Sequence, residues 1–146
     1  MNNKLEIYFV HTCLGKTYFC QHNTGWFDLD ISMLLGGMSA KTCINIIEKY
    51  SQYGYKFLVS ATRRMIYMIG KYVRARTHSG LVVYLPEHTQ EAYNFYIKNT
   101  EQRGYPRIKK EIKKFFRNIE EIENLLTEED TIIYIPTGKY FSDIFN

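Results

Sequence analysis

Apolar and polar positions alternate along two short runs near the start of the chain, 4–12 and 16–22. Such alternation is typical of strands that bury one face. The dipeptide Gly15-Lys16 lies between the two runs, and a two-residue loop with glycine first is typical of a tight hairpin turn. The pattern therefore predicts an N-terminal hairpin, followed by a third strand at 25–32.

Helical spacing of apolar residues replaces this alternation further along the chain. It predicts a helix that begins at Ser39, its N-cap, and ends at Gly54. The run 63–77 fits both a helix and a strand, and its length favours a helix capped by Ser60 or Thr62. A helix is also predicted at 89–104.

The clearest periodicity in the chain follows Pro106, which is typical of the first residue of a helix. One face of this predicted helix is apolar for about five turns. The apolar positions on it are Ile108, Ile112, Phe115, Phe116, Ile119, Ile122 and Leu126.

Three further apolar runs, 55–62, 81–85 and 131–136, are short enough to be buried strands. Strands that alternate with helices indicate helices packed on a central sheet. We therefore predict an α/β or α+β fold with a single globular domain over residues 1–146. Its mixed central sheet has about five or six strands, an N-terminal hairpin and about four covering helices.

Composition adds an expected location. With 146 residues the chain is long enough for one domain with its own core. No apolar run approaches the length of a membrane span, and no long apolar segment follows Met1. The three cysteines are an odd number, which favours reduced thiols. We expect a cytoplasmic protein without membrane contact, and the abundance of Lys, Asn, Ile and Tyr favours a phage or another mobile element as its source.

Charge is distributed unevenly around the overall net charge of +4. Residues 61–117 contain 13 basic and 4 acidic side chains, whereas residues 118–146 contain 1 basic and 7 acidic side chains. On the helix after Pro106 the cations come first and the acids follow, which is the reverse of what a helix dipole favours. This segregation indicates an anionic partner, either nucleic acid or the acidic surface of another protein.

The residues predicted to bind that partner form two basic clusters. They are Arg63, Arg64, Lys71, Arg74, Arg76, Arg107, Lys109, Lys110, Lys113, Lys114 and Arg117. The favoured hypothesis is therefore a small binding protein rather than an enzyme.

The stretch 34–47, LLGGMSAKTCINII, contains glycines and a Lys-Thr pair before a predicted helix. A phosphate-binding loop of the Walker type requires G-x-x-x-x-G-K-[ST]. If Lys41-Thr42 ended this pattern, its glycine positions would hold Leu35 and Ala40. We therefore interpret the stretch as a turn and a helix start capped by Ser39, with Lys41 available to an anion.

Two candidate metal sites come from the first thirty residues. The segment 11–22 carries the pattern H-x-C-x6-C-x-H, and a hairpin would place its four side chains on one face. Zinc prefers nitrogen and sulfur ligands of this kind, although half-buried Cys and His side chains on strands explain the pattern as well. The set is His11, Cys13, Cys20 and His22. Asp28 and Asp30 alternate on the third predicted strand, where carboxylates can hold Mg²⁺.

The stretch 92–98, AYNFYIK, follows the predicted strand 81–85 and has the pattern A-x-x-F-Y-x-K on a helix. It resembles the late segment of the GNAT acyltransferase family. In that family the tyrosine at the position of Tyr96 often serves as the general acid for the departing thiolate of coenzyme A. The resemblance implies an alternative function, a degenerate GNAT-like N-acyltransferase that uses acetyl-CoA. The family's pyrophosphate-binding signature, R/Q-x-x-G-x-G/A, is absent from the chain.

Overall fold

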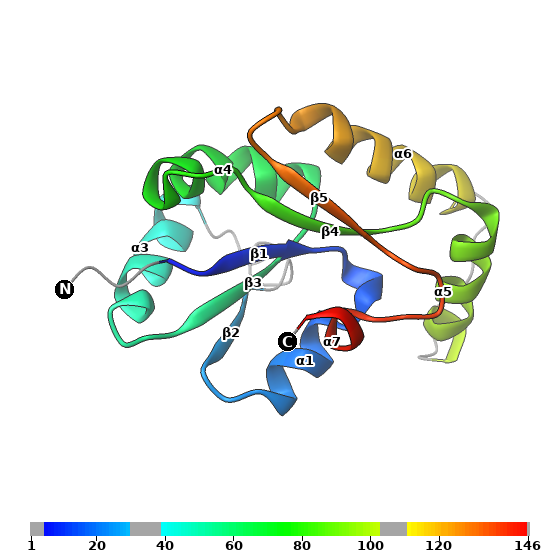
Figure 1. The fold of residues 1–146 in the computed structure, drawn as a ribbon, viewed down its shortest axis with the longest axis horizontal. Coiled ribbons are helices and arrows are strands. Elements are labelled where there is room, and N and C mark those ends of the chain that lie inside the picture. The colour runs from blue at the N-terminus through cyan, green and yellow to red at the C-terminus, as the bar shows by residue number, and fades with distance from the viewer. Residues whose placement is uncertain (1–4, 30–38, 103–110, 146) are drawn as a thin grey trace.

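Five parallel strands form one sheet in the order β2-β3-β1-β4-β5 (Figure 1). The computed structural model describes residues 5–29, 39–102 and 111–145. The strands are β1 (Ile7–Val10), β2 (Trp26–Leu29), β3 (Lys56–Ser60), β4 (Val82–Pro86) and β5 (Thr131–Ile135). The predicted α/β character is confirmed, but the described sheet is parallel throughout rather than mixed.

Helices connect the strands, as a parallel sheet requires. They are the 3-10 turn η1 (Thr12–Leu14) and the α-helices α1 (Lys16–His22), α3 (Ala40–Ser51), α4 (Arg63–Thr77), α5 (Gln90–Gln102), α6 (Glu111–Leu125) and α7 (Phe141–Ile144). Two predicted N-caps are confirmed: the side chain of Ser39 accepts the N–H of Thr42, and that of Thr62 accepts the N–H of Met65. The glycine turn predicted before Ser39 lies outside the described residues.

The predicted N-terminal hairpin is wrong, because residues 16–22 form helix α1 instead of a strand. Gly15 turns the chain with φ 79° and ψ 33°, a left-handed conformation that suits glycine. Lys16 and Phe19, which are three residues apart, are the buried residues of the helix. This spacing matches a helical face and outweighs the apparent alternation. Strand β1 pairs with β3 and β4, which come later in the chain.

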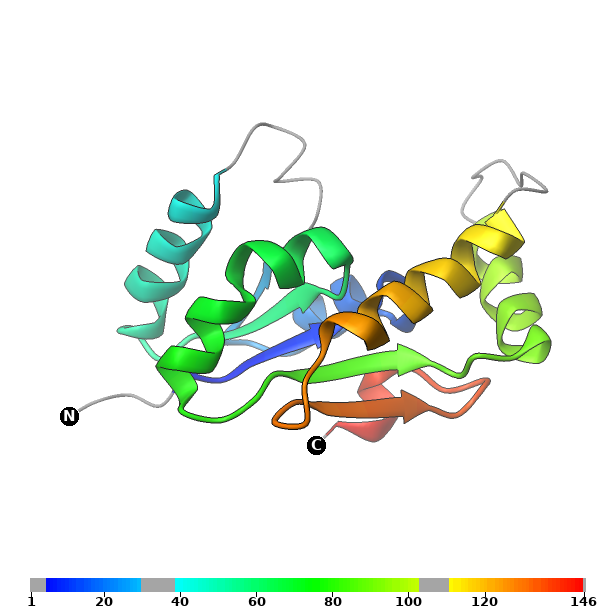
Figure 2. The same cartoon turned by 90° about the horizontal axis from the view of Figure 1, so that it is seen from above.

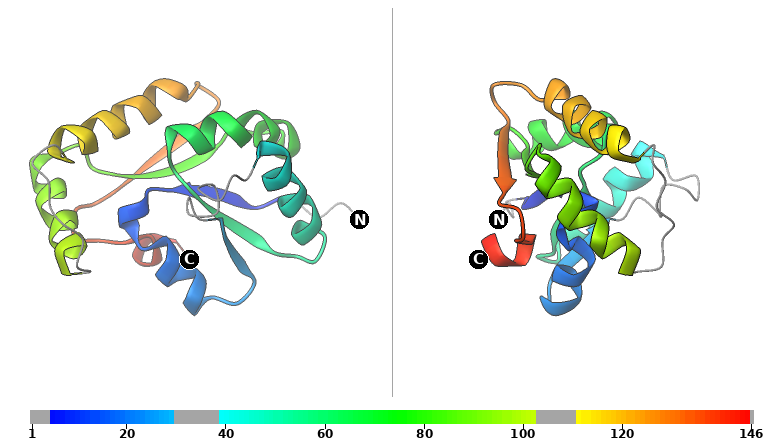
Figure 3. Two further views of the ribbon diagram at one scale, coloured as in Figure 1. Left: turned by 180° about the vertical axis from the view of Figure 1, so that it is seen from behind. Right: turned by 90° about the vertical axis from the view of Figure 1, so that its right-hand side faces the viewer.

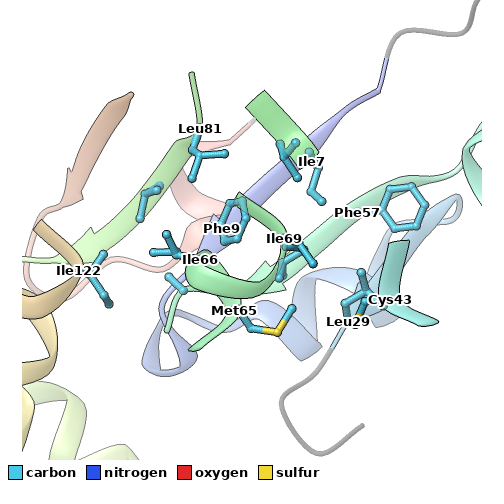
Figure 4. Close-up of a cluster of buried hydrophobic side chains, with 14 of the residues drawn as sticks. Ile7, Phe9, Leu29, Cys43, Phe57, Met65, Ile66, Ile69, Leu81 and Ile122 are labelled. Carbon is cyan, nitrogen blue, oxygen red and sulfur yellow. The ribbon is translucent and has the colours of Figure 1, made fainter. Parts of the chain in front are cut away.

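One face of the sheet is covered by α3, α4 and α6 (Figure 2). Buried side chains of these helices and of all strands but β5 form one apolar cluster there, with Ile132 of β5 packed against it. Figure 4 shows its centre, in which Met65, Ile66 and Ile69 of α4 gather with Ile7 and Phe9 of β1. Helix α6 contributes Ile119 and Ile122, two positions of the apolar face predicted from the sequence.

The opposite face carries α1 and α7 and a second cluster rich in aromatic side chains. Phe19 of α1 meets the ring of Phe141 of α7 edge-on, with ring centroids 4.8 Å apart. Phe19 also meets Trp26 of β2, at 5.1 Å. These contacts fix the short helix α1 over the β2–β3 side of the sheet.

The carboxyl ends of the strands share one edge of the sheet, at the end where α5 lies (Figures 2 and 3). The chain leaves β1 toward β2 at one margin of the sheet and leaves β4 toward β5 at the other. Because β1 and β4 are neighbours, their connections diverge from each other at this edge. In parallel α/β sheets this is the usual place for a ligand. Within the described ranges, every helix is too short or too polar to cross a bilayer.

Candidate functional site

The connection between β1 and α1 occupies this carboxyl edge. It starts beside β4, where the N–H of His11 donates to the carbonyl of Tyr84 at 3.0 Å. The 3-10 turn follows, and the N–H of Leu14 donates to the carbonyl of His11 at 3.0 Å. Gly15 then directs the chain into α1 without a side-chain cap on the helix. The connection is thus held by β4 at one end and by the packing of α1 at the other.

Lys16 and Thr17, the first two residues of α1, share one carboxylate. The Lys16 ammonium forms an ion pair with Asp28 of β2, and only 4% of the Lys16 side chain is exposed. The Thr17 hydroxyl donates to the second oxygen of Asp28 at 3.2 Å. Because a buried ammonium needs an anion beside it, Asp28 neutralises the charge of Lys16. A cation and a hydroxyl thus contact the same carboxylate.

The cation and the hydroxyl come from the sequence Val10-His11-Thr12-Cys13-Leu14-Gly15-Lys16-Thr17. It matches G-x-x-x-x-G-K-[ST] at every defined position except the first. It also has the structural context that the pattern requires, a strand before it and a helix at its Gly-Lys-Thr end. The interpretation of Gly15-Lys16 as a hairpin turn concealed this match in the sequence. A Gly-Lys-Thr triplet at the end of the loop that follows an apolar strand is the signal that identifies it.

The departure from the pattern lies at Val10, which takes the place of the first glycine. Val10 is the last residue of β1 and is fully buried in the second cluster. The chain turns later, through the 3-10 turn and the left-handed Gly15. The loop therefore reaches α1 by a route in which a glycine at position 10 is not needed.

Ser60 lies directly beside this loop and has an unusual hydroxyl. It is the last residue of β3 and pairs in register with Val10. Its side chain is fully buried, and its oxygen has no hydrogen-bond partner among the described residues. Leu58 packs with α1 whereas Val59 packs with α3 and α4, so alternation places Ser60 on the face of α1. A buried donor left open at this edge is a group that a ligand can satisfy.

His11 and Cys13 form a second pair within the loop. The His11 Nδ1 atom lies 3.1 Å from the Cys13 sulfur and accepts the Cys13 backbone N–H at 3.3 Å. Burial lowers the pKa of His11 to about 4, so its imidazole is neutral at physiological pH. The ring of Phe115 of α6 meets it edge-on at 5.9 Å. His11 thus acts as a neutral acceptor that shapes the loop.

The other two predicted zinc ligands lie on α1. Burial, with the negative charge of Asp28, raises the pKa of the Cys20 thiol to about 12. His22 stacks on Tyr18 with ring centroids 4.0 Å apart. Among the described residues, no three His, Cys, Asp or Glu side chains gather in a way that could hold a metal ion. Asp30, the partner predicted for Asp28, lies outside those residues.

The basic cluster on α4 is divided by the structure. Arg74 pairs with Asp130 at 2.6 Å and Arg76 with Glu48 at 2.9 Å, so both are engaged within the protein. Arg63, Arg64 and Lys71 are exposed. In the second cluster, Lys114 and Arg117 of α6 are exposed. Arg107, Lys109 and Lys110 lie outside the described residues, as does the side chain of Lys113.

Tyr96, the predicted general acid of the acyltransferase alternative, is buried in α5. Only 2% of it is exposed, and its hydroxyl donates to the carbonyl of Lys139 at 2.8 Å. Burial is also the main cause that raises the pKa of this phenol. Strand β4 pairs with β5 over its whole length, Val82–Pro86, without a splayed end. These observations give acyl transfer no support.

Comparison with protein-family models, curated proteins and solved structures finds no match for this chain.

Proposed function

We propose that the chain binds the phosphates of a nucleoside triphosphate, with Mg²⁺, at the loop between β1 and α1. The observation that carries the proposal is the contact of Asp28 with both Lys16 and Thr17. In phosphate-binding loops of this pattern the lysine reaches the β- and γ-phosphates and the threonine hydroxyl coordinates Mg²⁺. A nearby aspartate completes the metal environment. Strand β3, which lies beside β1, contains no acidic residue. We therefore assign this role to Asp28 of β2.

The contacts of Asp28 with Lys16 and Thr17 suit exchange with a nucleotide. A triphosphate competes with Asp28 for the Lys16 ammonium, and Asp28 is then available to Mg²⁺ and its water ligands. The buried hydroxyl of Ser60 offers a further hydrogen bond at the same edge. Phosphoryl transfer needs positioning and charge stabilisation more than covalent help from the protein. This set of residues supplies those two elements.

Thr17 provides the sharpest test because its side chain is exposed, so its replacement changes no core packing. Binding of the non-hydrolysable analogue AMP-PNP with Mg²⁺ is measured by calorimetry. We expect Thr17→Val to weaken it by about tenfold or more, since an oxygen ligand of the metal is lost. We expect Thr17→Ser, which keeps the hydroxyl, to bind like the parent chain.

Thr42 supplies a matched control. It follows Lys41 at the start of α3 and is also exposed, so Thr42→Val changes an equivalent Lys-Thr pair. We expect this variant to keep full affinity. Absence of binding to the parent chain at millimolar analogue, or equal affinities of Thr17→Val and Thr17→Ser, would contradict the proposal.

A polyanionic partner, nucleic acid or an acidic protein surface, is a second proposal. It is supported by the exposed cations Lys71, Lys114 and Arg117, which have no ion pair among the described residues. Binding to DNA or RNA through phosphate contacts weakens steeply as salt rises. Affinity that is unchanged between 50 and 200 mM salt, about the range over which phosphate contacts show their effect, would exclude it.

A further inference from the structure

A stripe of exposed side chains follows the outer face of α4. It consists of Arg63, Arg64, Tyr67 and Lys71. Their spacing of three and four residues places them on one side of the helix. The inner side is buried on the sheet through Met65, Ile66 and Ile69. Tyr67 is 82% exposed, which is a large aromatic surface to leave in water.

The stripe begins beside the candidate nucleotide site. The N–H of Ala61 donates to the carbonyl of Val10 at 3.0 Å, and α4 starts two residues later at Arg63. Neighbouring strands lie about 4.8 Å apart, so the first turn of α4 is next to the loop that follows Val10. Tyr67 lies about one turn, roughly 5.4 Å, further along the helix.

The charges at this end of α4 have no explanation within the described part of the fold. The first turn contains two arginines and no acid, although a helix N-terminus favours anions. Neither Arg63 nor Arg64 has an ion-pair partner among the described residues. Thr62 already caps the helix by accepting the N–H of Met65. The guanidinium groups are therefore the donors that this turn presents to a ligand. Such groups bind phosphate in a two-pronged geometry.

We propose that Arg63, Arg64 and Tyr67 bind a nucleoside monophosphate as the phosphoryl acceptor, next to the triphosphate held at Lys16 and Thr17. This inference rests on the proposed function and deepens it. The two arginines hold the phosphate, and the base stacks on the exposed ring of Tyr67. An anion with a planar ring fits the stripe better than a neutral alcohol, because the stripe offers two cations followed by one aromatic face.

The chemistry balances without a general base. An oxygen of the acceptor phosphate, already ionised at neutral pH, attacks the γ-phosphorus of the triphosphate. A new P–O bond forms, and the bond between that phosphorus and the β–γ bridging oxygen breaks. Its electron pair stays on the departing diphosphate, so the products are two nucleoside diphosphates. The arginines also reduce the repulsion between the two phosphate groups.

The experiment measures formation of diphosphates from Mg·ATP when AMP, CMP, GMP, UMP or dTMP is added separately. We expect at least one monophosphate to be converted, and its parent nucleoside not to be. Arg63→Gln and Arg64→Gln are expected to raise the KM for that monophosphate by about tenfold or more. They are expected to leave the Kd of Mg·AMP-PNP unchanged. Tyr67→Ala should raise the same KM, and Tyr67→Phe should restore it.

Lys49→Gln is the matched control, since Lys49 is an exposed cation in the last turn of α3. Conversion of none of the monophosphates, equal use of the nucleoside, or unchanged KM values in both arginine variants would overturn the acceptor site. Each of these results leaves binding of Mg·AMP-PNP intact. Failure of the parent chain to bind Mg·AMP-PNP would instead overturn the proposed function.

Discussion

Arg74 and Asp130 form a two-pronged ion pair between α4 and the turn that precedes β5. The Arg74 Nε and Nη2 atoms lie 3.1 Å and 2.6 Å from the two carboxylate oxygens. The Asp130 side chain is fully buried and also accepts the N–H groups of Leu81 and Thr127, at 2.8 Å and 2.7 Å. One carboxylate thus joins a helix, the start of β4 and the turn before the edge strand.

This network predicts a loss of stability in acid. Burial on its own would raise the pKa of Asp130, but the hydrogen bonds from Arg74, Thr127 and Leu81 outweigh it and lower the pKa to about 2. A depressed carboxyl pKa stabilises the fold above the unfolded value of about 3.9 and loses this contribution as pH falls toward 2. We expect the free energy of unfolding, measured with urea, to decrease by about 2 kcal/mol over that pH window.

Asp130→Asn tests the assignment. This variant is expected to lower the free energy of unfolding by about 3 kcal/mol at pH 7, because Arg74 loses its charged partner. The decrease in stability in acid should then lack the contribution of Asp130. Glu128→Gln, which changes an exposed acid two residues earlier, serves as the control. An acid loss of equal size in Asp130→Asn and the control would contradict the role of Asp130.

His11 predicts a second pH dependence in a different window. Burial lowers its pKa to about 4, so the unfolded chain binds a proton below about 6.5 and the folded chain does not. Stability is therefore complete above pH 6.5 and falls by up to about 3 kcal/mol as pH decreases to 4. We expect His11→Gln to lose this slope and His22→Asn, on the exposed side of α1, to keep it. A wild-type slope in His11→Gln would assign the effect to other groups.

The elements with strong local signals could be predicted from the sequence. Ser39 and Thr62 mark the starts of α3 and α4, and the apolar face of α6 carries Ile119 and Ile122 as expected. The parallel order of the sheet could not be predicted, since pairing of β1 with β3 and β4 depends on contacts distant in sequence.

The candidate site was missed for a related reason. Residues 16–22 fit alternation as well as a helix, and a hairpin interpretation removed the Gly-Lys-Thr triplet from its position after a strand. The role of Asp28 depends on β2 lying near α1 across the sheet, which no local pattern reveals. Of the basic residues, only the structure separates the paired Arg74 and Arg76 from the exposed Arg63 and Arg64.

Gly80 is predicted to be irreplaceable for steric reasons. A Cβ atom at this position would lie 1.7 Å from the carbonyl oxygen of Glu129, a backbone atom that cannot rotate away. We expect Gly80→Ala to lower the free energy of unfolding by more than about 2 kcal/mol. Gly70 of α4 is the control, because its Cβ would meet its nearest neighbour, Leu81, at 3.5 Å. Gly70→Ala is expected to be neutral or stabilising by up to about 1 kcal/mol, and equal losses in the two variants would contradict the close approach at Gly80.

Replacement of Asp28 distinguishes a role in metal binding from a purely structural role of its ion pair with Lys16. In Asp28→Asn, ATP without Mg²⁺ is expected to bind more tightly than to the parent chain, because its phosphates no longer compete with a carboxylate for Lys16. With Mg²⁺ the gain should disappear, since the metal loses an acidic partner beside Thr17. The ratio of the two Kd values, without and with Mg²⁺, is therefore expected to shrink by about tenfold, a difference of about 1.4 kcal/mol.

Calorimetric titrations with ATP and EDTA, and with Mg·AMP-PNP, give the two Kd values, and thermal unfolding verifies that the variant is folded. Glu6→Gln is the control, since it removes a surface carboxylate 3.5 Å from Lys56. If Asp28 only anchors α1 to the sheet, its removal loosens the loop for every ligand. Affinity would then fall equally with and without Mg²⁺, and the assignment of Asp28 to the metal would be wrong.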